Sequence, residues 1–179
     1  MEAIPYDELL RKYRKKPLVE LEGLPHKLEC GRQDIEKIIP HRSPLLFVDT
    51  LSAVDFQNGM IAGGRIMQAA DPVFSGHFPE FPVYPGNFTV EMIGQLALCL
   101  YYFVNNQRSS IGPDAKPIAL RATKMGGALF QEPILPGDEV ILLAQKINFD
   151  AYFGSMIGQA IVRGKVAVVT IGEVMILED

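Results

Sequence analysis

Residues 87–105 read NFTVEMIGQLALCLYYFVN and contain the longest apolar run of the chain. Only Glu91 and Gln95 interrupt this run, so a helix formed here is apolar on nearly every face. The run is shorter than the roughly 20 apolar residues that a membrane span needs, and we expect no membrane span. A helix of this composition is typical of a protein core. We therefore predict a buried central helix over residues 87–105, with Asn87 as its N-cap.

Strands are predicted on both sides of this helix. Two precede it, at residues 45–54 and 59–69, and are joined by a hairpin turn at residues 57–59. The remaining strands follow the helix, at residues 117–131, 139–150, 153–163 and 165–177. One long buried helix with about five or six mostly antiparallel strands predicts an α+β fold in which a sheet wraps the helix.

The N-terminal residues 1–32 are predicted as an extension to a single domain that covers residues 33–179. Residues 5–16 have the pattern of a helix, whereas the Pro and Gly residues of 17–32 favour extended or irregular chain. A short helix is predicted at residues 33–39. Five of the 17 basic residues lie in the first helix, at positions 11, 12, 14, 15 and 16. They form either a solvated face or a docking surface for an acidic partner.

Composition narrows the class of protein. The 179 residues are 48% hydrophobic and 21% charged, which is typical of one globular domain. The net charge of −4 argues against a nucleic-acid-binding role. The two cysteines, Cys30 and Cys99, have neither the spacing of a zinc site nor that of a disulfide framework. The N-terminus also lacks the apolar segment of a secretory signal, so we expect a cytoplasmic protein.

One histidine lies where chemistry is expected. The Pro- and Gly-rich residues 71–86 predict a stiff, shaped loop that leads into the central helix, and His77 lies inside it. A neutral imidazole can accept a proton, so His77 is a candidate general base. His41 precedes a predicted strand in a rigid turn, where we favour a structural hydrogen-bonding role. His26 is expected to be exposed.

Glu91 lies in the first turns of the predicted helix. A carboxylate there either complements the helix dipole at the surface or is buried and has a chemical role. Burial can raise a carboxyl pKa by up to about 3–5 units, which outweighs a dipole effect of about 0.3–1 kcal/mol. If the helix is enclosed, Glu91 stays protonated near neutral pH and can act as a general acid.

Gly86 follows Pro85 and places a backbone N–H at the start of the helix. Such an N–H is a natural donor to a carbonyl oxygen that becomes negative during a reaction. The base His77, the acid Glu91 and this donor around an apolar space favour one kind of chemistry. It is removal of a proton beside a carbonyl, followed by loss of a β-leaving group.

The same stretch resembles the signature of the 3-hydroxyacyl-acyl-carrier-protein dehydratases of bacterial fatty-acid synthesis. In that family the catalytic His is followed by the loop Gly nine residues on and by the acidic residue fourteen on, which is the spacing of His77, Gly86 and Glu91. The similarity covers about residues 33–178. The motifs that carry it are IPHR (39–42), LLFVD (45–49), GHFP (76–79), PVYPG (82–86), Glu91, Gln95, FQEPILPGD (130–138) and the segment 158–166.

The resemblance implies the hot-dog fold and a homodimer with two active sites at its interface, in which His77 of one subunit faces Glu91 of the other. A glutamate as the acid goes with the plain dehydratases of the family, which commonly assemble as a trimer of dimers. The implied substrate is a 3-hydroxyacyl thioester on acyl carrier protein. The resemblance implies no metal and no organic cofactor.

Further residues are assigned to substrate and carrier. Gln95 lies one helical turn after Glu91 and would orient its carboxyl group, or it is a buried Gln bonded to backbone. Asn87 departs from the family pattern and would add a polar contact at the tunnel mouth. Tunnel walls, with core packing as the alternative for each, are expected at Phe74, Phe78, Phe88 and Met92. Docking of the acidic carrier is expected at Arg108, Lys116, Arg121 and Lys124, ahead of the basic cluster in residues 11–16, and either set can instead be solvated surface.

Three rival functions stay open from the sequence. A thioesterase of the same fold would release free carrier thiol and fatty acid. An enoyl hydratase would run the reverse reaction on coenzyme A thioesters. A non-catalytic acyl-binding module would bind the substrate unchanged, which the presence of both His77 and Glu91 disfavours.

Overall fold

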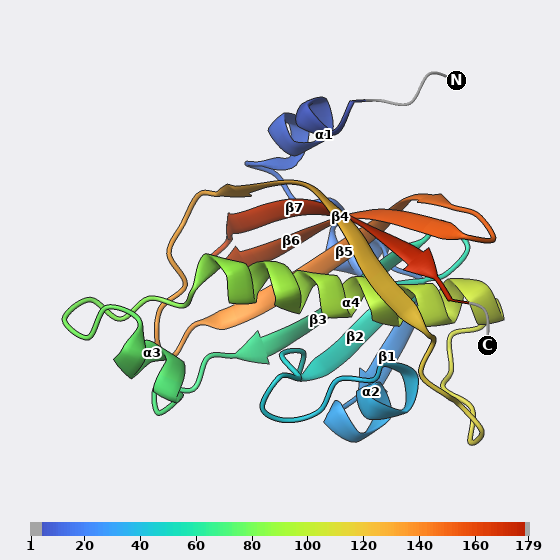
Figure 1. Ribbon diagram of the computed structural model, residues 1–179, viewed down its shortest axis with the longest axis horizontal. Coiled ribbons are helices and arrows are strands. Elements are labelled where there is room, and N and C mark those ends of the chain that lie inside the picture. Colours follow the sequence, from blue (N-terminus) through green and yellow to red (C-terminus); the bar gives the residue numbers. More distant parts are fainter. Residues whose placement is uncertain (1–4, 178–179) are drawn as a thin grey trace.

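The fold is built around helix α4 (Gly86–Asn106), which runs along one face of a curved sheet (Figure 1). The structure is a computed structural model that describes residues 5–177. Leu96, Cys99 and Phe103 of α4 are fully buried in the main core. By length and composition α4 could cross a membrane, but here it packs against β3, β5, β6 and β7 as the core helix.

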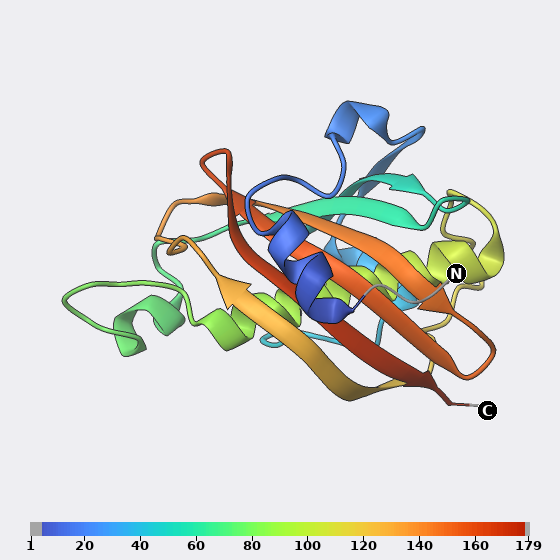
Figure 2. The ribbon, with the colours of Figure 1, turned by 90° about the horizontal axis from the view of Figure 1, so that it is seen from above.

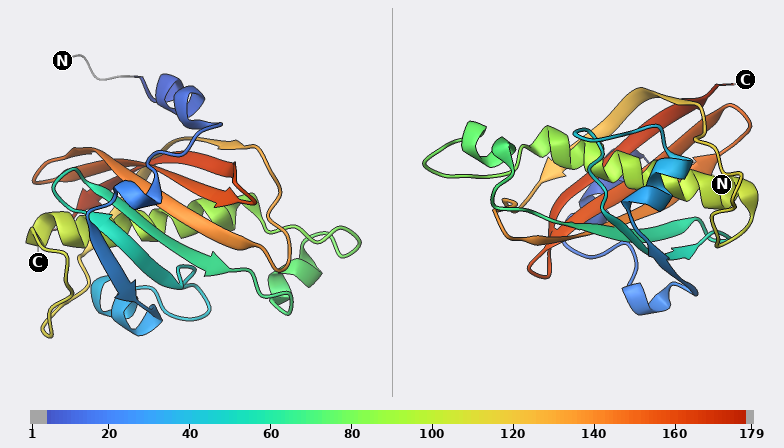
Figure 3. Two further views of the ribbon diagram at one scale, coloured as in Figure 1. Left: turned by 180° about the vertical axis from the view of Figure 1, so that it is seen from behind. Right: turned by 90° about the horizontal axis from the view of Figure 1, so that it is seen from below.

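The sheet wraps α4, as the views from behind and below make plain (Figure 3). Within residues 5–177 it has seven strands in the order β1-β2-β3-β5-β6-β7-β4, and every neighbouring pair is antiparallel. This arrangement confirms the predicted α+β class and the hot-dog fold. The strands are β1 (His26–Cys30), β2 (Thr50–Asp55), β3 (Met60–Ile66), β4 (Leu120–Phe130), β5 (Glu139–Phe149), β6 (Phe153–Val162) and β7 (Lys165–Ile176).

Two glycines allow α4 to lie close to the sheet. A Cβ at Gly158 of β6 would lie 2.3 Å from Cγ2 of Ile93, and a Cβ at Gly63 of β3 would lie 2.9 Å from Cδ1 of Leu96. Since real Cβ atoms are not found so close to neighbouring atoms, a larger residue at either position would push the helix away from the sheet. The packing of the helix therefore depends on these two positions.

The N-terminal helix α1 (Tyr6–Tyr13) lies on the opposite face of the sheet from α4, over β4 and β7 (Figures 1 and 2). Its apolar side chains Leu9 and Leu10 are buried there. The fully buried Gln159 of β6 donates to the carbonyl oxygens of Tyr13 and Lys16, at 2.6 and 2.9 Å, and accepts from the N–H of Leu18 at 2.8 Å. These bonds fix residues 13–18 to the sheet.

Several predicted boundaries differ from the structure. Helix α4 begins at Gly86 with Pro85 as its N-cap, so the prediction of Asn87 as the N-cap is wrong. Residues 17–32, expected to be extended or irregular, contain β1 and a short 3₁₀ turn. The predicted loop of residues 71–86 contains helix α3 (Pro72–Gly76). The predicted short helix is α2 (Arg32–Ile38).

Candidate active site

His77 is held at the end of helix α3. Asp71 caps the helix by accepting from the N–H of Val73 at 3.0 Å, and the N–H of His77 donates to the carbonyl of Val73 at 2.9 Å. The ring nitrogen Nδ1 of His77 lies 2.8 Å from the carbonyl oxygen of Val83. Because a carbonyl can only accept, Nδ1 carries the proton and Nε2 keeps a free lone pair. The loop therefore presents His77 as a base through Nε2.

A buried ion pair fixes this loop to the sheet. Arg65 of β3 lies 2.9 Å from the carboxylate of Asp71, and the two side chains are only 10% and 14% exposed. The guanidinium also lies over the rings of Phe47 and Tyr84. Since Asp71 caps α3 while it binds Arg65, the sheet and the helix that carries His77 are joined through one carboxylate.

Gly86 opens helix α4 beside His77. The two residues line a cavity of about 550 Å³, together with Asn87 and Phe130. Within residues 5–177 the N–H of Gly86 has no hydrogen-bond acceptor, as is usual for the first N–H groups of a helix. A Cβ at this position would lie 2.6 Å from Cε1 of the Phe130 ring, so glycine leaves the space that the ring occupies. A base and a free backbone donor thus share one cavity.

Glu91 lies on α4 within a hydrogen-bonded group. Its Oε1 accepts from Nε2 of Gln95 at 2.9 Å. Gln95 is fully buried and also donates to the carbonyl of Leu45 at 2.8 Å, while its own oxygen accepts from the N–H of Phe47 at 2.7 Å. Gln95 is therefore both a contact of the Glu91 carboxyl group and a buried side chain bonded to backbone. It ties Glu91 to the segment that precedes β2.

His41 is the second partner of Glu91. Its Nε2 lies 3.3 Å from Oε1 of Glu91, whereas its Nδ1 is buried and has no hydrogen-bond partner within residues 5–177. The hydrogen bond from His41 is the largest influence on the pKa of Glu91 and lowers it. Burial opposes this effect, and the bond from Gln95 adds to it. His41 therefore contacts the Glu91 carboxyl group, and no local pattern in the sequence indicates this partner.

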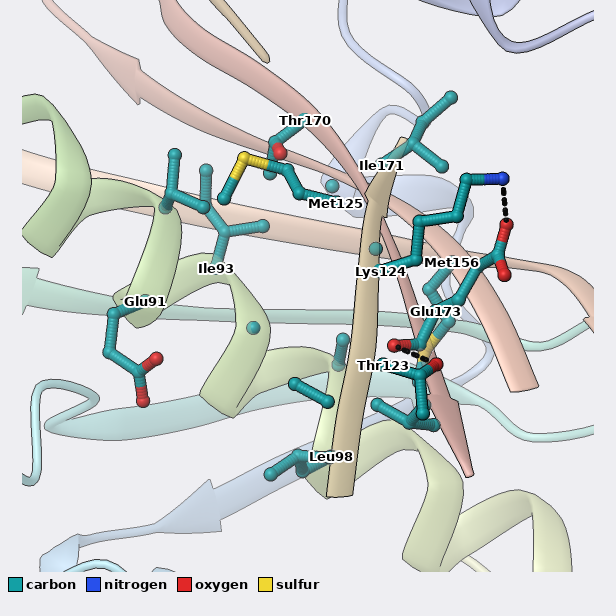
Figure 4. Close-up of a pocket in the computed structure, with 17 residues that line it drawn as sticks. Glu91, Ile93, Leu98, Thr123, Lys124, Met125, Met156, Thr170, Ile171 and Glu173 are labelled. Atoms are coloured by element: carbon teal, nitrogen blue, oxygen red, sulfur yellow. Dashed lines mark hydrogen bonds and ion pairs between the residues drawn. The ribbon is translucent and has the colours of Figure 1, made fainter. Parts of the chain in front are cut away.

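The prediction that burial keeps Glu91 protonated is wrong for the single chain. Its side chain is 50% exposed, and its pKa lies below the ordinary value because two N–H groups favour the carboxylate. Glu91 lies at the rim of an apolar cavity of about 320 Å³ between α4, β4 and β7. Figure 4 shows its carboxylate directed away from Met125 and from the ion pair of Lys124 with Glu173.

Within one chain the structure does not bring His77 to Glu91. His77 lines the cavity of Gly86, whereas Glu91 lines the cavity between α4 and β4. No hydrogen bond or ion pair joins the two side chains in the described part of the chain.

The predicted tunnel residues divide into two groups. Phe74 and Met92 are buried in the main core and line neither cavity, as their core-packing alternative expects. Phe78 and Phe88 are exposed, at 58% and 38%. Asn87 is exposed and lines the His77 cavity.

The predicted docking residues are all exposed, but two of them already have partners. Lys124 lies 3.1 Å from Glu173, and Arg108 donates to the hydroxyl of Tyr102 at 2.9 Å. Lys116 and Arg121 form no ion pair within residues 5–177. These two cations are therefore free to meet a partner.

Comparison with known proteins identifies the family. The family model described as a FabA-like domain matches residues 39–171. The chain belongs to the FabA-like family. Among its FabA-like relatives, the 3-hydroxyacyl-[acyl-carrier-protein] dehydratase FabZ of Chlamydia muridarum is 35% identical over 137 residues, which cover 76% of this chain and 85% of the relative. The protein of the same name from Xanthomonas campestris pv. campestris strain B100 is 30% identical over 141 residues, which cover 79% and 88%.

Similarity to solved structures supports the fold alone. The dehydratase heterocomplex ApeI:P from Xenorhabdus doucetiae superposes with a TM-score of 0.60 at 13% sequence identity, covering 81% of this chain and 91% of that one. The PaaI protein of E. coli, from a phenylacetic acid degradation operon, gives a TM-score of 0.52 at 15% identity, covering 74% and 81%. At these identities a FabA-like chain and its structural neighbours share the arrangement of helix and sheet, and the chemistry has to be argued from the site.

Proposed function

We propose that this FabA-like chain dehydrates 3-hydroxyacyl thioesters of acyl carrier protein to trans-2-enoyl thioesters, in fatty-acid or related acyl-chain synthesis. The dehydratase names of its relatives support the reaction. The observation that carries it lies in one cavity: His77 has its lone pair on Nε2, because Nδ1 is bonded to Val83, and the free N–H of Gly86 lines the same space.

The proposed reaction moves one proton out of the substrate and one into it. Nε2 of His77 removes the proton from the carbon beside the thioester, while the N–H of Gly86 binds the thioester oxygen as negative charge grows there. The electron pair of the broken C–H bond forms the double bond. The β-hydroxyl leaves as water with a proton from Glu91, which becomes a carboxylate. Exchange with solvent returns His77 and Glu91 to their starting states.

The proposed active species is a homodimer in which His77 of one subunit faces Glu91 of the other. Strand β4 is an edge strand of the sheet, and its residues 121–125 are exposed. Met125 on β4 is 60% exposed, and Phe78 and Phe81 of the His77 loop are 58% and 64% exposed. An unpaired strand edge and large exposed apolar side chains are typical of a surface that another chain covers. A second copy of this chain is the occupant we propose.

A partner subunit that covers Glu91 would also change the pKa of its carboxyl group. Removing water from a half-exposed carboxyl group disfavours its charged form and raises its pKa. The dimer would thus move Glu91 from the carboxylate favoured in one chain towards the acid that the reaction needs. Higher assembly, as a trimer of dimers, remains a prediction that sedimentation tests.

The acyl chain and its carrier would meet different surfaces. Phe78, Phe88 and Asn87 are the exposed candidates for contact with the acyl chain, and each buried methylene would contribute about 0.8 kcal/mol. Lys116 and Arg121, which follow α4, are the preferred docking cations for an acidic carrier protein. A protein with these partners would act in the cytoplasm.

One assay separates this function from its rivals. The protein is incubated with a 3-hydroxyacyl carrier protein and with its coenzyme A analogue, while enoyl absorbance and free thiol are followed together. We expect enoyl formation without thiol release, abolished by His77→Ala and nearly abolished by Glu91→Gln. Release of thiol would indicate a thioesterase, and preference for coenzyme A would indicate a hydratase. A fully active His77→Ala variant would refute the assignment.

Docking is tested by charge reversal. The double variant Lys116→Glu, Arg121→Glu should lose activity on the carrier-bound substrate and keep it on a small thioester mimic. Lys12→Glu with Lys15→Glu changes the net charge by the same amount in the second-choice cluster of residues 11–16, and it tests that alternative docking surface. An equal effect of the first pair on both substrates would exclude docking at these residues.

A further inference from the structure

Both hydrogen-bond donors near Glu91 approach the same oxygen. Nε2 of Gln95 lies 2.9 Å from Oε1, and Nε2 of His41 lies 3.3 Å from that same atom. Within residues 5–177 no hydrogen bond to Oε2 is found. The carboxyl group therefore has one anchored oxygen and one free oxygen.

The surroundings of His41 select one form of its ring. Its Nδ1 is buried without a partner in the described part of the chain. A proton on Nδ1 would leave an unpaired N–H at that buried position, whereas a proton on Nε2 faces Oε1 of Glu91. A neutral ring with its proton on Nε2 keeps Nδ1 unprotonated and lets Nε2 donate to Oε1 of Glu91.

The backbone around His41 is fixed by two side chains. The guanidinium of Arg42 donates to the carbonyl oxygens of Ile39 and His41, at 2.9 and 2.7 Å, and to that of Glu36 at 2.8 Å. Gln95 holds the following residues through its bonds to Leu45 and Phe47. His41 is thus placed by bonds to α2 on one side and to α4 on the other.

Other charges near Glu91 are already paired. Lys124 of β4 and Glu173 of β7 line the same cavity and lie 3.1 Å from each other. His41 is consequently the one titratable partner of the Glu91 carboxyl group among the described residues.

We propose that His41 is a positioning residue for Glu91, whose neutral Nε2–H holds Oε1 together with Gln95 and reserves Oε2 for the proton that passes to the departing hydroxyl. In that step the Oε2–H bond and the C–O bond of the substrate break, and water leaves with the proton. The two N–H groups on Oε1 then stabilise the carboxylate that forms. This inference rests on the proposed dehydration and names a residue beyond its base, acid and backbone donor.

The first test observes the ring directly and needs no activity. Long-range ¹H–¹⁵N spectra of protein labelled at its histidines, with the His41 signals assigned from the His41→Leu variant, report which ring nitrogen carries the proton. We expect the Nε2–H form of His41 near neutral pH. A proton on Nδ1, or a charged ring at that pH, would overturn the proposal.

The second test is kinetic. His41→Leu should lower kcat by roughly 10- to 100-fold with little change in KM, because a misoriented acid costs the chemical step. Loss of the donor should also move the limb of the pH profile that titrates with Glu91 to higher pH, since the bond from His41 lowers its pKa. His41→Gln, which keeps an N–H donor, should recover part of kcat and the original profile, and a purely structural role would not predict this.

The controls separate the proposal from the function on which it rests. His26→Leu, a histidine on β1, should keep the wild-type kcat. An inactive wild-type protein would refute the dehydration itself. An active wild type with unchanged kcat and pH profile in His41→Leu would refute only the role of His41. If His41→Leu does not fold, the comparison of His41→Gln with wild type and the spectra of the wild-type ring decide the matter.

Discussion

Replacing Gln95 by leucine should weaken the fold and the site together. Gln95 is fully buried and makes three hydrogen bonds, with Leu45, Phe47 and Glu91. Leucine has a similar volume, so the change removes polar contacts and leaves little cavity. The buried N–H of Phe47 would lose its acceptor, at a cost of about 1–3 kcal/mol, and the two other bonds contribute about 0.5–1.5 kcal/mol each. The expected loss in the free energy of unfolding is about 2–6 kcal/mol.

Urea denaturation measures this loss. With a slope of about 2–3 kcal/mol per molar urea, as expected for a chain of 179 residues, the midpoint should fall by roughly 0.7–3 M while the slope stays constant. Gln33→Leu is the matched control, because Gln33 is exposed on α2, and it should change stability by less than about 0.5 kcal/mol. Equal midpoints for the two variants would contradict the view that Gln95 joins α4 to the segment before β2.

Three further changes test other contacts. Gly86→Ala would place a Cβ 2.6 Å from the ring of Phe130, which is 53% exposed and can turn away into the cavity. Because the displaced ring would then occupy space beside the base and the backbone donor, kcat should fall about 10-fold or more while the melting temperature changes little. Wild-type kinetics would contradict this expectation. Gln159→Leu should release the N-terminal segment from the sheet, because it removes the three hydrogen bonds that hold residues 13–18. We expect faster tryptic cleavage within residues 11–16 and a free energy of unfolding that is lower by about 1–3 kcal/mol. Unchanged cleavage would show that other contacts hold the segment. In the single chain the pKa of Glu91 is below its ordinary value of 4.5, so its charged form stabilises the fold above that pH, and this contribution disappears as the pH falls through the lower folded-state value. For protein diluted until it is monomeric, acid denaturation followed by circular dichroism should show a smaller loss of stability below pH 4.5 for Glu91→Gln than for wild type, and identical acid transitions would contradict this sign.

The central helix and the sheet were predictable because each has a strong local pattern. The apolar run predicts a buried helix, and α4 is buried apart from one face that carries Asn87, Glu91 and Gly94. The strands of the C-terminal half are separated by clear turns. Strand β1 was predicted only as extended or irregular chain because its alternating pattern covers just five residues, HKLEC, next to Pro25 and Gly31. It forms by pairing with β2, which is a long-range contact. The cap at Asn87 failed because Pro85 fixes its own φ and lets the helix start one residue earlier.

The sequence predicted which residues form the site, but not which groups those residues contact. The spacing of His77, Gly86 and Glu91 carried the resemblance, but the tautomer of His77 depends on the carbonyl of Val83 in the folded loop. The contact of His41 with Glu91 joins residues fifty apart in the sequence, and no local pattern encodes it. The exposure of Glu91 likewise depends on what covers α4.

The most direct measurement of the central claim is complementation between two inactive chains. His77→Ala and Glu91→Gln proteins are unfolded together, refolded as a mixture, and assayed for enoyl formation, with each variant refolded alone as the control. If one subunit supplies the base and the other the acid, each mixed dimer regains one intact site, and a random mixture recovers about a quarter of the wild-type rate. A mixture that contains mixed dimers by mass spectrometry but stays as inactive as its two components would contradict a site shared between subunits.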